Sequence, residues 1–449
     1  MGRAPADATA LARMIAAGEI TAEAALAGAL ARAEVASDLG AVAWMTRDPD
    51  APEAGPFAGV PMLVKDLGAP FRGIPARAGS AALSRRRGAA DSALARRFRG
   101  AGLRPFGATT VPEFGLSLAT EPAIGPRCRN PLDPERTPGG SSGGAAAAVA
   151  AGIVAVAHAT DAGGSIRVPA ACCGLVGLKP SRGAVPGGPG FGNHLAGIAS
   201  EFALVRSLRD ACALWPCLAG AAEGPEPDPA QLAAGGRLTV GVVGDAAGIA
   251  PERAAAVKVA AAALGRAGHR IVQVPAARLA DPVRRSDVAF DRIVSANLAQ
   301  LAEAGLDADA CEPLTQAVIA RGRAMPATAL WSALQGGAVA AHHLWRLFRD
   351  VDLLLTPMLA TAPPPLGAFP TDHGDVGAHF ARMAAFAPYA TLANVTGAPA
   401  LTVPVGADAD GLPLPVQLLA PMGGDLRLLG AATLLNGGWT HPIPLGAAA

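Results

Sequence analysis

Hydrophobic and polar residues along this chain of 449 residues alternate in blocks that predict strands and helices in turn. Short apolar runs bounded by turn residues, which are typical of buried strands, lie at residues 41–45, 59–66, 103–106, 238–243, 270–274, 352–357, 401–405 and 415–419. Helical patterns lie at residues 22–35, 92–99, 207–215, 251–264 and 425–436, and they dominate residues 286–350. This alternation predicts an α/β architecture.

Local signals predict where several of these elements begin and end. Thr21 and Asp91 precede helical patterns as N-caps, and Pro251 stands at the first-turn position that tolerates proline. We expect another helix to end near Pro216. The residues 220–236 are rich in Pro, Gly and Ala, but strands are predicted on both sides, so we interpret them as a surface loop inserted into one fold.

The residues 137–180 are the stretch around which the chain is organised. Two Gly-Ser clusters, residues 139–144 and 163–165, flank an Ala/Val-rich segment that predicts one buried helix and one strand. Glycine lets a backbone approach a ligand closely or adopt conformations that other residues avoid. Because the apolar segment would anchor both clusters to the core, we interpret them as two halves of one site.

Lysine is rare in this sequence, which draws attention to Lys65. Of the 37 basic residues, only Lys65, Lys179 and Lys258 are lysine. Arginine stays protonated in a protein, whereas a desolvated lysine can give up its proton. Lys65 and Asp66 end a strand of buried type, which would deliver their side chains to a site. We expect Lys179 to pack or bind carbonyl groups and Lys258 to be solvated.

The charge, cysteine and histidine patterns indicate which partners and which catalytic chemistry to expect. The net charge of +1 favours neither nucleic acid nor a membrane, and the longest apolar run, residues 145–157, is too short to span a bilayer. Six cysteines without a CxxC pair, and a start without an apolar leader, predict a reduced, cytoplasmic protein. The histidines follow no HExxH motif, so we expect no metal. No G-x-S-x-G motif surrounds Ser165 and no histidine stands in a catalytic motif, so lysine is left as the base for a serine nucleophile.

Four ordered motifs resemble those of the amidase signature family. They lie at residues 59–66, 139–144, 161–167 and 174–183. Weaker similarity extends over nearly the whole chain. The resemblance implies an α/β fold with a large mixed, twisted β-sheet covered on both faces by helices. It also implies one amidase domain over residues 1–449, with a signature core at about 59–185, a variable substrate-pocket region at about 186–350, and a C-terminal part that completes the sheet.

The resemblance also implies a catalytic triad and its supporting residues. Ser165 matches the family nucleophile, Ser141 the bridging serine that follows a cis peptide bond, and Lys65 the base, whose pKa burial would lower. We expect Asp161 and Arg167 to form an ion pair that fixes the nucleophile loop, with Ser142 supporting the loop of Ser141. The oxyanion hole would consist of the backbone N–H groups of Ala162, Gly163, Gly164 and Ser165.

The implied activity is hydrolysis of the carbon–nitrogen bond of a small carboxamide or a linear or cyclic amide. Ser165 would form an acyl-enzyme, and neither a metal nor an organic cofactor is needed. Two alternatives stay open: an ammonia-generating component similar to that of the tRNA-linked amidotransferases, and a catalytically inactive binding homologue. Val168 weakens the first alternative, because those amidotransferase components usually carry glutamine at this position.

Stretches outside these motifs are similar to the branch of the family that contains 6-aminohexanoate-cyclic-dimer hydrolase. They lie at residues 119–122, 156–158, 201–210 and 386–389. We expect the substrate pocket to form from the residues near 193–199 and the helical segment at about 311–346. The expected partner is a small amide, with neither nucleic acid nor a membrane, and a homodimer is one assembly to test.

Overall fold

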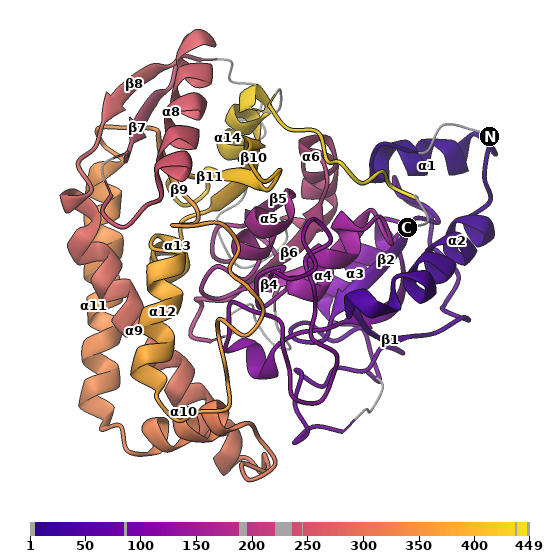
Figure 1. Cartoon of the computed structure of the whole chain (residues 1–449), viewed down its shortest axis with the longest axis horizontal. Coiled ribbons are helices and arrows are strands. Elements are labelled where there is room, and N and C mark those ends of the chain that lie inside the picture. Colours follow the sequence, from indigo (N-terminus) through magenta and orange to yellow (C-terminus); the bar gives the residue numbers. More distant parts are fainter. Residues whose placement is uncertain are drawn as a thin grey trace.

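One twisted sheet of eleven strands runs through the computed structural model, which describes residues 5–84, 88–187, 195–220, 236–244, 246–435 and 438–446 (Figure 1). The strands are β1 (Val42–Met45), β2 (Pro61–Lys65), β3 (Arg104–Thr109), β4 (Val156–Asp161), β5 (Val176–Lys179), β6 (Ser200–Val205), β7 (Thr239–Val242), β8 (Arg270–Gln273), β9 (Leu353–Pro357), β10 (Ala400–Ala407) and β11 (Pro413–Leu419). Their order across the sheet is β1-β3-β2-β4-β6-β5-β10-β11-β9-β7-β8.

The sheet is mixed, as the resemblance to the amidase signature family implies. β2 pairs in parallel with β3 and β4, and β7 pairs in parallel with β8 and β9. The pairs between these two groups are antiparallel, including β4 with β6 and β10 with β11. The parallel pairing of β2 with β4 brings the end of the Lys65 strand next to the strand that leads to Ser165.

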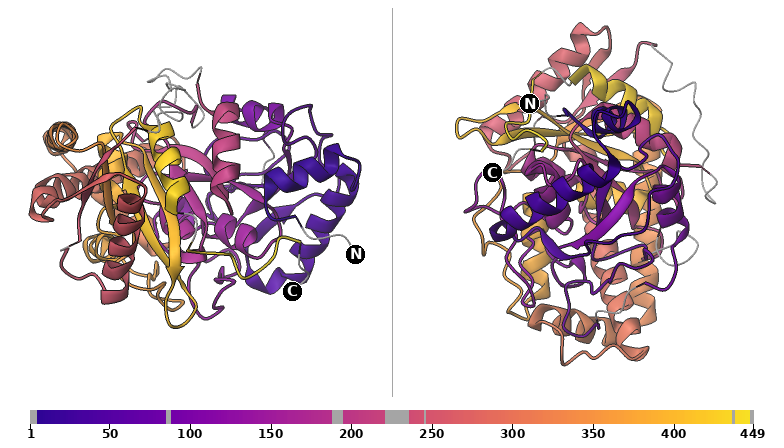
Figure 2. Two further views of the ribbon diagram at one scale, coloured as in Figure 1. Left: turned by 90° about the horizontal axis from the view of Figure 1, so that it is seen from above. Right: turned by 90° about the vertical axis from the view of Figure 1, so that its right-hand side faces the viewer.

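Helices cover both faces of the sheet, which confirms the predicted α/β class (Figure 2). They are α1 (Ala8–Ala16), α2 (Ala22–Val35), α3 (Ala93–Gly100), α4 (Gly143–Ala150), α5 (Arg167–Cys173), α6 (Leu208–Leu218), α8 (Pro251–Arg266), α9 (Ala277–Glu303), α10 (Pro313–Arg323), α11 (Ala327–Leu347), α12 (Val376–Phe386), α13 (Ala390–Thr396) and α14 (Asp425–Ala432). The long helices α9 and α11 lie side by side at the left of Figure 1.

The helix starts follow the predicted signals, with one exception. The Thr21 hydroxyl caps α2 and Pro251 begins α8, as predicted. The prediction for Asp91 is wrong, because the neighbouring Ser92 hydroxyl caps α3. The Asp91 carboxylate instead forms an ion pair with Arg99 at 3.0 Å and accepts from the Arg72 N–H at 2.8 Å.

Two features of the fold differ in detail from the sequence predictions. α6 does not end at Pro216 but continues to Leu218; proline removes one N–H group, and the apolar side chains of this helix remain buried in the core. The fully buried strand β6 at the centre of the sheet is not among the strands predicted from the sequence. The proposed inserted loop lies outside the described residues over 221–235.

Small residues let α4 pack directly on the sheet. All eight residues of this helix, GGAAAAVA, are buried. A methyl group added at Gly144 would lie 2.4 Å from the Thr110 carbonyl oxygen and 2.7 Å from that of Ala41. The helix therefore approaches the backbone at the β1–β3 end of the sheet, and it begins directly after Ser141 and Ser142.

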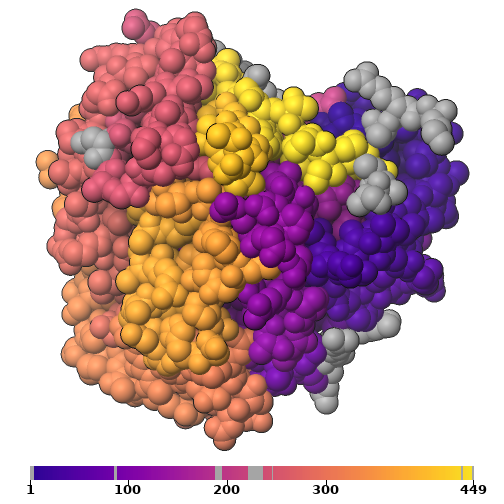
Figure 3. Space-filling model, viewed as in Figure 1, coloured from indigo at the N-terminus to yellow at the C-terminus, as the bar shows by residue number. Residues whose placement is uncertain are grey.

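Segments far apart in the sequence close one face of the molecule. Figure 3 shows the residues near 360–390, in orange, against those near 110–140, in purple. The Arg136 guanidinium donates to the Pro363 carbonyl at 2.7 Å, and the Leu366 N–H donates to the Glu135 carbonyl at 3.0 Å. The proline-rich loop thus connects the late part of the chain to the segment that leads into the first Gly-Ser cluster.

The contact between α4 and the sheet gives a prediction about stability. Gly144→Ala should lower the free energy of unfolding by about 1–3 kcal/mol, because backbone atoms would have to move. The matched change Gly336→Ala lies in α11, where nothing lies within 4 Å of the added carbon. It should raise stability by up to about 1 kcal/mol. Chemical denaturation of both variants checks this, and equal stabilities would contradict the packing described.

Candidate active site

Lys65 is the last residue of β2, and its side chain is buried next to polar groups. The residue is 2% exposed, and its Nζ lies 2.8 Å from Ser141 Oγ, 2.7 Å from Thr160 Oγ1 and 3.4 Å from the Thr160 carbonyl oxygen. Burial lowers the pKa of Lys65 to about 7, although the Asp161 and Glu201 carboxylates favour the charged form. A neutral amine has two N–H donors and one lone pair, so it can satisfy all three contacts.

A histidine and a glutamate lie behind this lysine. The Lys65 backbone N–H donates to His158 Nδ1 at 3.4 Å, and His158 Nε2 forms a hydrogen bond with Glu201 Oε2 at 2.8 Å. Both side chains are buried, and the His158 ring packs beside Phe71 and Phe98. These contacts fix the end of β2 against β4 and β6.

The two Gly-Ser clusters meet at one cavity, as predicted. Ser165 lies between β4 and α5, and Ser141 precedes α4 after a cis peptide bond from Gly140. The Ser142 N–H donates to the Ser165 carbonyl at 3.3 Å, and its hydroxyl donates to the Thr160 carbonyl at 3.2 Å. Ser141 and Ser165 are 2% and 7% exposed, and both line the same cavity.

A buried ion pair holds the second cluster in place. Arg167 donates to both oxygens of the Asp161 carboxylate, from Nε and Nη2, at 2.9 Å in each case. Burial alone would raise the pKa of Asp161, but the charge and hydrogen bonds of Arg167 hold it well below its usual range. The Asp161 carboxylate also accepts from the Gly164 and Ile166 N–H groups, at 2.7 and 3.1 Å. The expected ion pair is therefore present and fixes the loop.

The same arginine connects the loop to distant parts of the chain. Its Nη1 donates to Gln417 Oε1 on β11 at 2.6 Å. Its Nη2 donates to Asn394 Oδ1 on α13 at 2.7 Å and to the Ala390 carbonyl at 2.9 Å. Arg167 and the three residues that accept from it are all buried, so removal of the arginine would cost buried hydrogen bonds.

The backbone N–H groups of the second cluster differ in what they bind. The Gly164 N–H already donates to the Asp161 carboxylate. Within the described part of the chain, the N–H groups of Ala162, Gly163 and Ser165 have no acceptor, and these three residues line the cavity. Of the four donors expected to form an oxyanion hole, three are therefore free to bind a ligand.

The cavity above the serines is mainly apolar. It has an empty volume of about 790 Å³, its mouth included. Its lining consists of Leu67, Phe114, Gly115, Leu116, Ser141, Thr160, Ala162, Gly163, Ser165, Leu195, Ala199, Phe290, Val294, Asn297, Leu298, Leu301 and Met383. Leu195 and Ala199 confirm part of the pocket expected near residues 193–199, while residues 188–194 lie outside the described structure.

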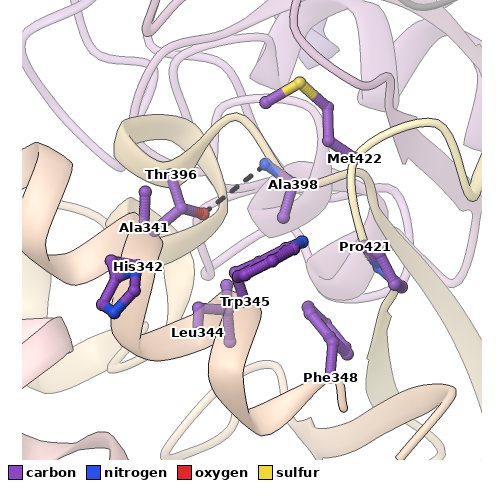
Figure 4. A pocket seen from close by; sticks show the side chains of 9 residues that line it. All are labelled: Ala341, His342, Leu344, Trp345, Phe348, Thr396, Ala398, Pro421 and Met422. Carbon is purple, nitrogen blue, oxygen red and sulfur yellow. Dashed lines mark hydrogen bonds between the residues drawn. The ribbon is translucent and has the colours of Figure 1, made fainter.

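The prediction that residues 311–346 form the substrate pocket is wrong. α9 supplies the wall, and α11 packs against α9 without adding any of the described lining residues. α11 instead borders a different cavity, shown in Figure 4, together with the end of α13 and the loops after α13 and β11. That cavity is lined by Ala341, His342, Leu344, Trp345, Phe348, Thr396, Ala398, Pro421 and Met422. It contains no residue of the expected triad.

Several site residues were not predicted from the sequence. Thr160 and His158 contact Lys65 from β4, and Asn394 and Gln417 bind Arg167. A signal for the first two was present, because 158 and 160 are alternate positions of one buried strand and therefore lie on the same face. Asn394 and Gln417 are more than 220 residues from Arg167 in the chain, so no local pattern connects them.

Other chemical classes find no support in the described residues. No three His, Cys, Asp or Glu side chains in these ranges are placed to hold one metal ion. The helices that the structure describes include none long and apolar enough to cross a membrane.

The second buried lysine, Lys179, lies as predicted. Its side chain is buried, and its Nζ donates to the Pro180 carbonyl at 2.5 Å.

Comparison with known proteins establishes the family. The sequence model of the Amidase family matches residues 23–429. The chain belongs to the amidase family. This amidase is 34% identical over 474 residues to 6-aminohexanoate-cyclic-dimer hydrolase of Pseudomonas sp. (strain NK87), with 96% of this chain and 94% of that protein covered. The enzyme of the same name from Paenarthrobacter ureafaciens is also 34% identical, over 473 residues, with the same coverage of 96% and 94%.

Solved structures confirm that the fold of this amidase is that of amidase-signature enzymes. The structure of 6-aminohexanoate cyclic dimer hydrolase complexed with substrate has a TM-score of 0.88 and 31% identity, and 98% of each chain is covered. A bacterial aryl acylamidase of the amidase signature family has a TM-score of 0.84 and 25% identity, with 99% of each chain covered. The amidase therefore hydrolyses carbon–nitrogen amide bonds other than peptide bonds.

The buried arginine gives a second stability prediction. Arg167→Leu should lower the free energy of unfolding by about 3–5 kcal/mol, because it leaves the Asp161 carboxylate buried without its cation. The control Arg284→Leu breaks an exposed pair with Asp281, in which the arginine side chain is 65% exposed. It should change stability by less than about 1 kcal/mol. Denaturant titration compares the two, and similar small losses would show that the buried pair is not needed.

Proposed function

We propose that this amidase cleaves small linear or cyclic amides through an acyl-enzyme on Ser165, with Ser141 as proton bridge and Lys65 as base. The observation that carries the proposal is the 2.8 Å contact between Lys65 Nζ and Ser141 Oγ beneath the cavity that Ser165 lines. A buried lysine whose pKa lies near neutrality can accept a proton at physiological pH. No cofactor takes part in these steps.

The proton moves along the two serines in this mechanism. The Ser141 hydroxyl gives its proton to Lys65 Nζ and accepts the proton of Ser165, because a hydroxyl is both donor and acceptor. Ser165 Oγ attacks the amide carbonyl carbon, and the C=O electron pair moves to the oxygen. When the intermediate collapses, the carbon–nitrogen bond breaks, and the proton held by Lys65 returns through Ser141 to the departing amine. Water then attacks the carbonyl carbon of the Ser165 ester, and its proton passes through Ser141 to Lys65. When the ester bond breaks, the acid is released and Ser165 regains its proton by the reverse path.

The oxyanion of each intermediate would bind the N–H groups of Ala162, Gly163 and Ser165. One such donor typically stabilises the transition state by roughly 3 kcal/mol. The Gly164 N–H would act indirectly, because its bond to Asp161 fixes the loop that presents the other three. Ser142 would support the first serine cluster through its bonds to Thr160 and Ser165.

The range of substrates follows from the cavity and the relatives. The apolar walls favour an uncharged aliphatic or aromatic group next to the scissile amide. The relatives named for hydrolysis of the 6-aminohexanoate cyclic dimer support amides with aliphatic spacers, linear or cyclic. We propose that the chain works as one amidase unit over residues 1–449; a homodimer and a cytoplasmic location stay predictions.

Trapping the acyl-enzyme tests this function. Brief incubation with an aryl amide should add the mass of the acyl group to the peptide that contains Ser165, as read by mass spectrometry of the quenched protein. Ser165→Ala should form no adduct and lose amide turnover, because the hydroxyl that attacks the amide carbonyl is gone. The matched control Ser332→Ala, an exposed change in α11, should behave as wild type. Wild-type turnover by Ser165→Ala would contradict the proposal, and ammonia transfer that needs a partner protein would support the amidotransferase alternative.

The activity should depend on pH through the lysine. Only neutral Lys65 can take the proton, so kcat/KM for an uncharged amide should rise through about pH 7 and then level off. Below that midpoint the loss should be roughly tenfold for each pH unit, because the neutral fraction falls in proportion. Initial rates between pH 5 and pH 9 measure this, and a profile that stays flat across the range would exclude Lys65 as the titrating base.

A further inference from the structure

One face of α9 forms a continuous wall of the catalytic cavity. Phe290, Val294, Asn297 and Leu301 follow one another at intervals of four, three and four residues, which places them on the same side of the helix. Phe290 lies at the catalytic end, since a methyl group added at Gly163 would lie 2.8 Å from its ring. Leu301, at the other end, is 36% exposed. The wall therefore runs from the oxyanion-binding loop to the mouth.

Asn297 is the polar residue of this apolar wall. Its neighbours along the cavity are Val294, Leu298 and Leu301. Among the described residues, its carboxamide has no hydrogen-bond partner. A carboxamide has two N–H donors and an acceptor oxygen, and its place on the wall leaves them open to a ligand in the cavity. Since none of the described lining residues is charged, this site suits a neutral polar group.

The position of Asn297 determines the distance between the polar group that it would bind and the carbonyl carbon at Ser165. Phe290 and Asn297 are seven residues apart on one helix, so about 10 Å separates their positions along the axis. A substrate whose carbonyl carbon lies at Ser165 would need a spacer of several methylene groups to bring a second polar group to Asn297. The apolar side chains between the two points would contact that spacer.

We propose that Asn297 selects substrates with two neutral amides, one at Ser165 and the other hydrogen-bonded to the Asn297 carboxamide across an aliphatic spacer. This inference rests on the proposed function, because it takes Ser165 as the site of cleavage. Asn297 is a specificity-determining residue in this scheme. It takes no part in proton transfer, so its loss leaves simple amides as substrates.

Two anilides of equal chain length test this selection. One carries an N-acetyl-6-aminohexanoyl group, which has a second amide, and the other a nonanoyl group, which has none; released aniline reports the rate. Asn297→Leu should lower kcat/KM for the first anilide by roughly 3- to 10-fold, the worth of one hydrogen bond. It should leave the nonanoyl anilide unchanged or faster. The control Gln300→Leu makes the same kind of change at an exposed position of α9 and should alter neither rate.

The outcomes separate this inference from the proposed function. An equal change for both anilides, or no change for either, overturns the role of Asn297 while Ser165 remains the nucleophile. A wild-type enzyme that turns over other amides but neither anilide overturns the diamide class. Full turnover of both anilides by Ser165→Ala would overturn the proposed function instead. Unaltered thermal unfolding of Asn297→Leu shows that a selective loss reflects the contact and not the fold.

Discussion

Burial of the Lys65 side chain removes the water that would otherwise stabilise its ammonium form, and the proposed chemistry depends on this. Serine hydroxyls are weak nucleophiles until a base takes a proton, and an exposed lysine is charged at neutral pH. Here β2 carries the amine into a site where the Ser141 and Thr160 hydroxyls surround it. The Asp161 and Glu201 carboxylates oppose the loss of charge, so the pKa falls only to about 7. The base is then neutral enough to act and basic enough to hold a proton.

The buried ion pair between Asp161 and Arg167 has a different part in the same site. It fixes the loop of the nucleophile and connects it to β11 and α13, which come from the last quarter of the chain. Removal of either charge would leave the other buried without a partner, which is far more destabilising than loss of an exposed pair. Lys65 at the end of β2 and the loop of Ser165 after β4 thus lie next to each other at the sheet, while α9 adds one wall of the cavity.

The parts of the site that carry short, dense motifs could be predicted from the sequence, and those that depend on packing could not. The Lys65 strand and both Gly-Ser clusters each place polar or glycine residues next to an apolar run. Their position beside the core could therefore be predicted from the sequence. The sequence places the pocket near residues 193–199 and 311–346, within a region of about 186–350 that also contains α9. Two long amphipathic helices give similar patterns, so only tertiary packing decides which of them faces the cavity. β6 was missed because it begins with Ser200 and Glu201, although it is fully buried. Asp91 failed as a cap because the neighbouring serine competes for the same position.

Direct titration of the lysine amines tests the central claim. The chain has three lysines, so ¹⁵N-lysine labelling gives few side-chain signals to follow by NMR against pH. Burial lowers the pKa of Lys179 as well, and the Lys65→Arg variant therefore identifies the Lys65 signal by its absence. The account predicts a Lys65 midpoint near 7, far below the ordinary value of 10.5. A Lys65 amine that remains protonated up to pH 10 would contradict it.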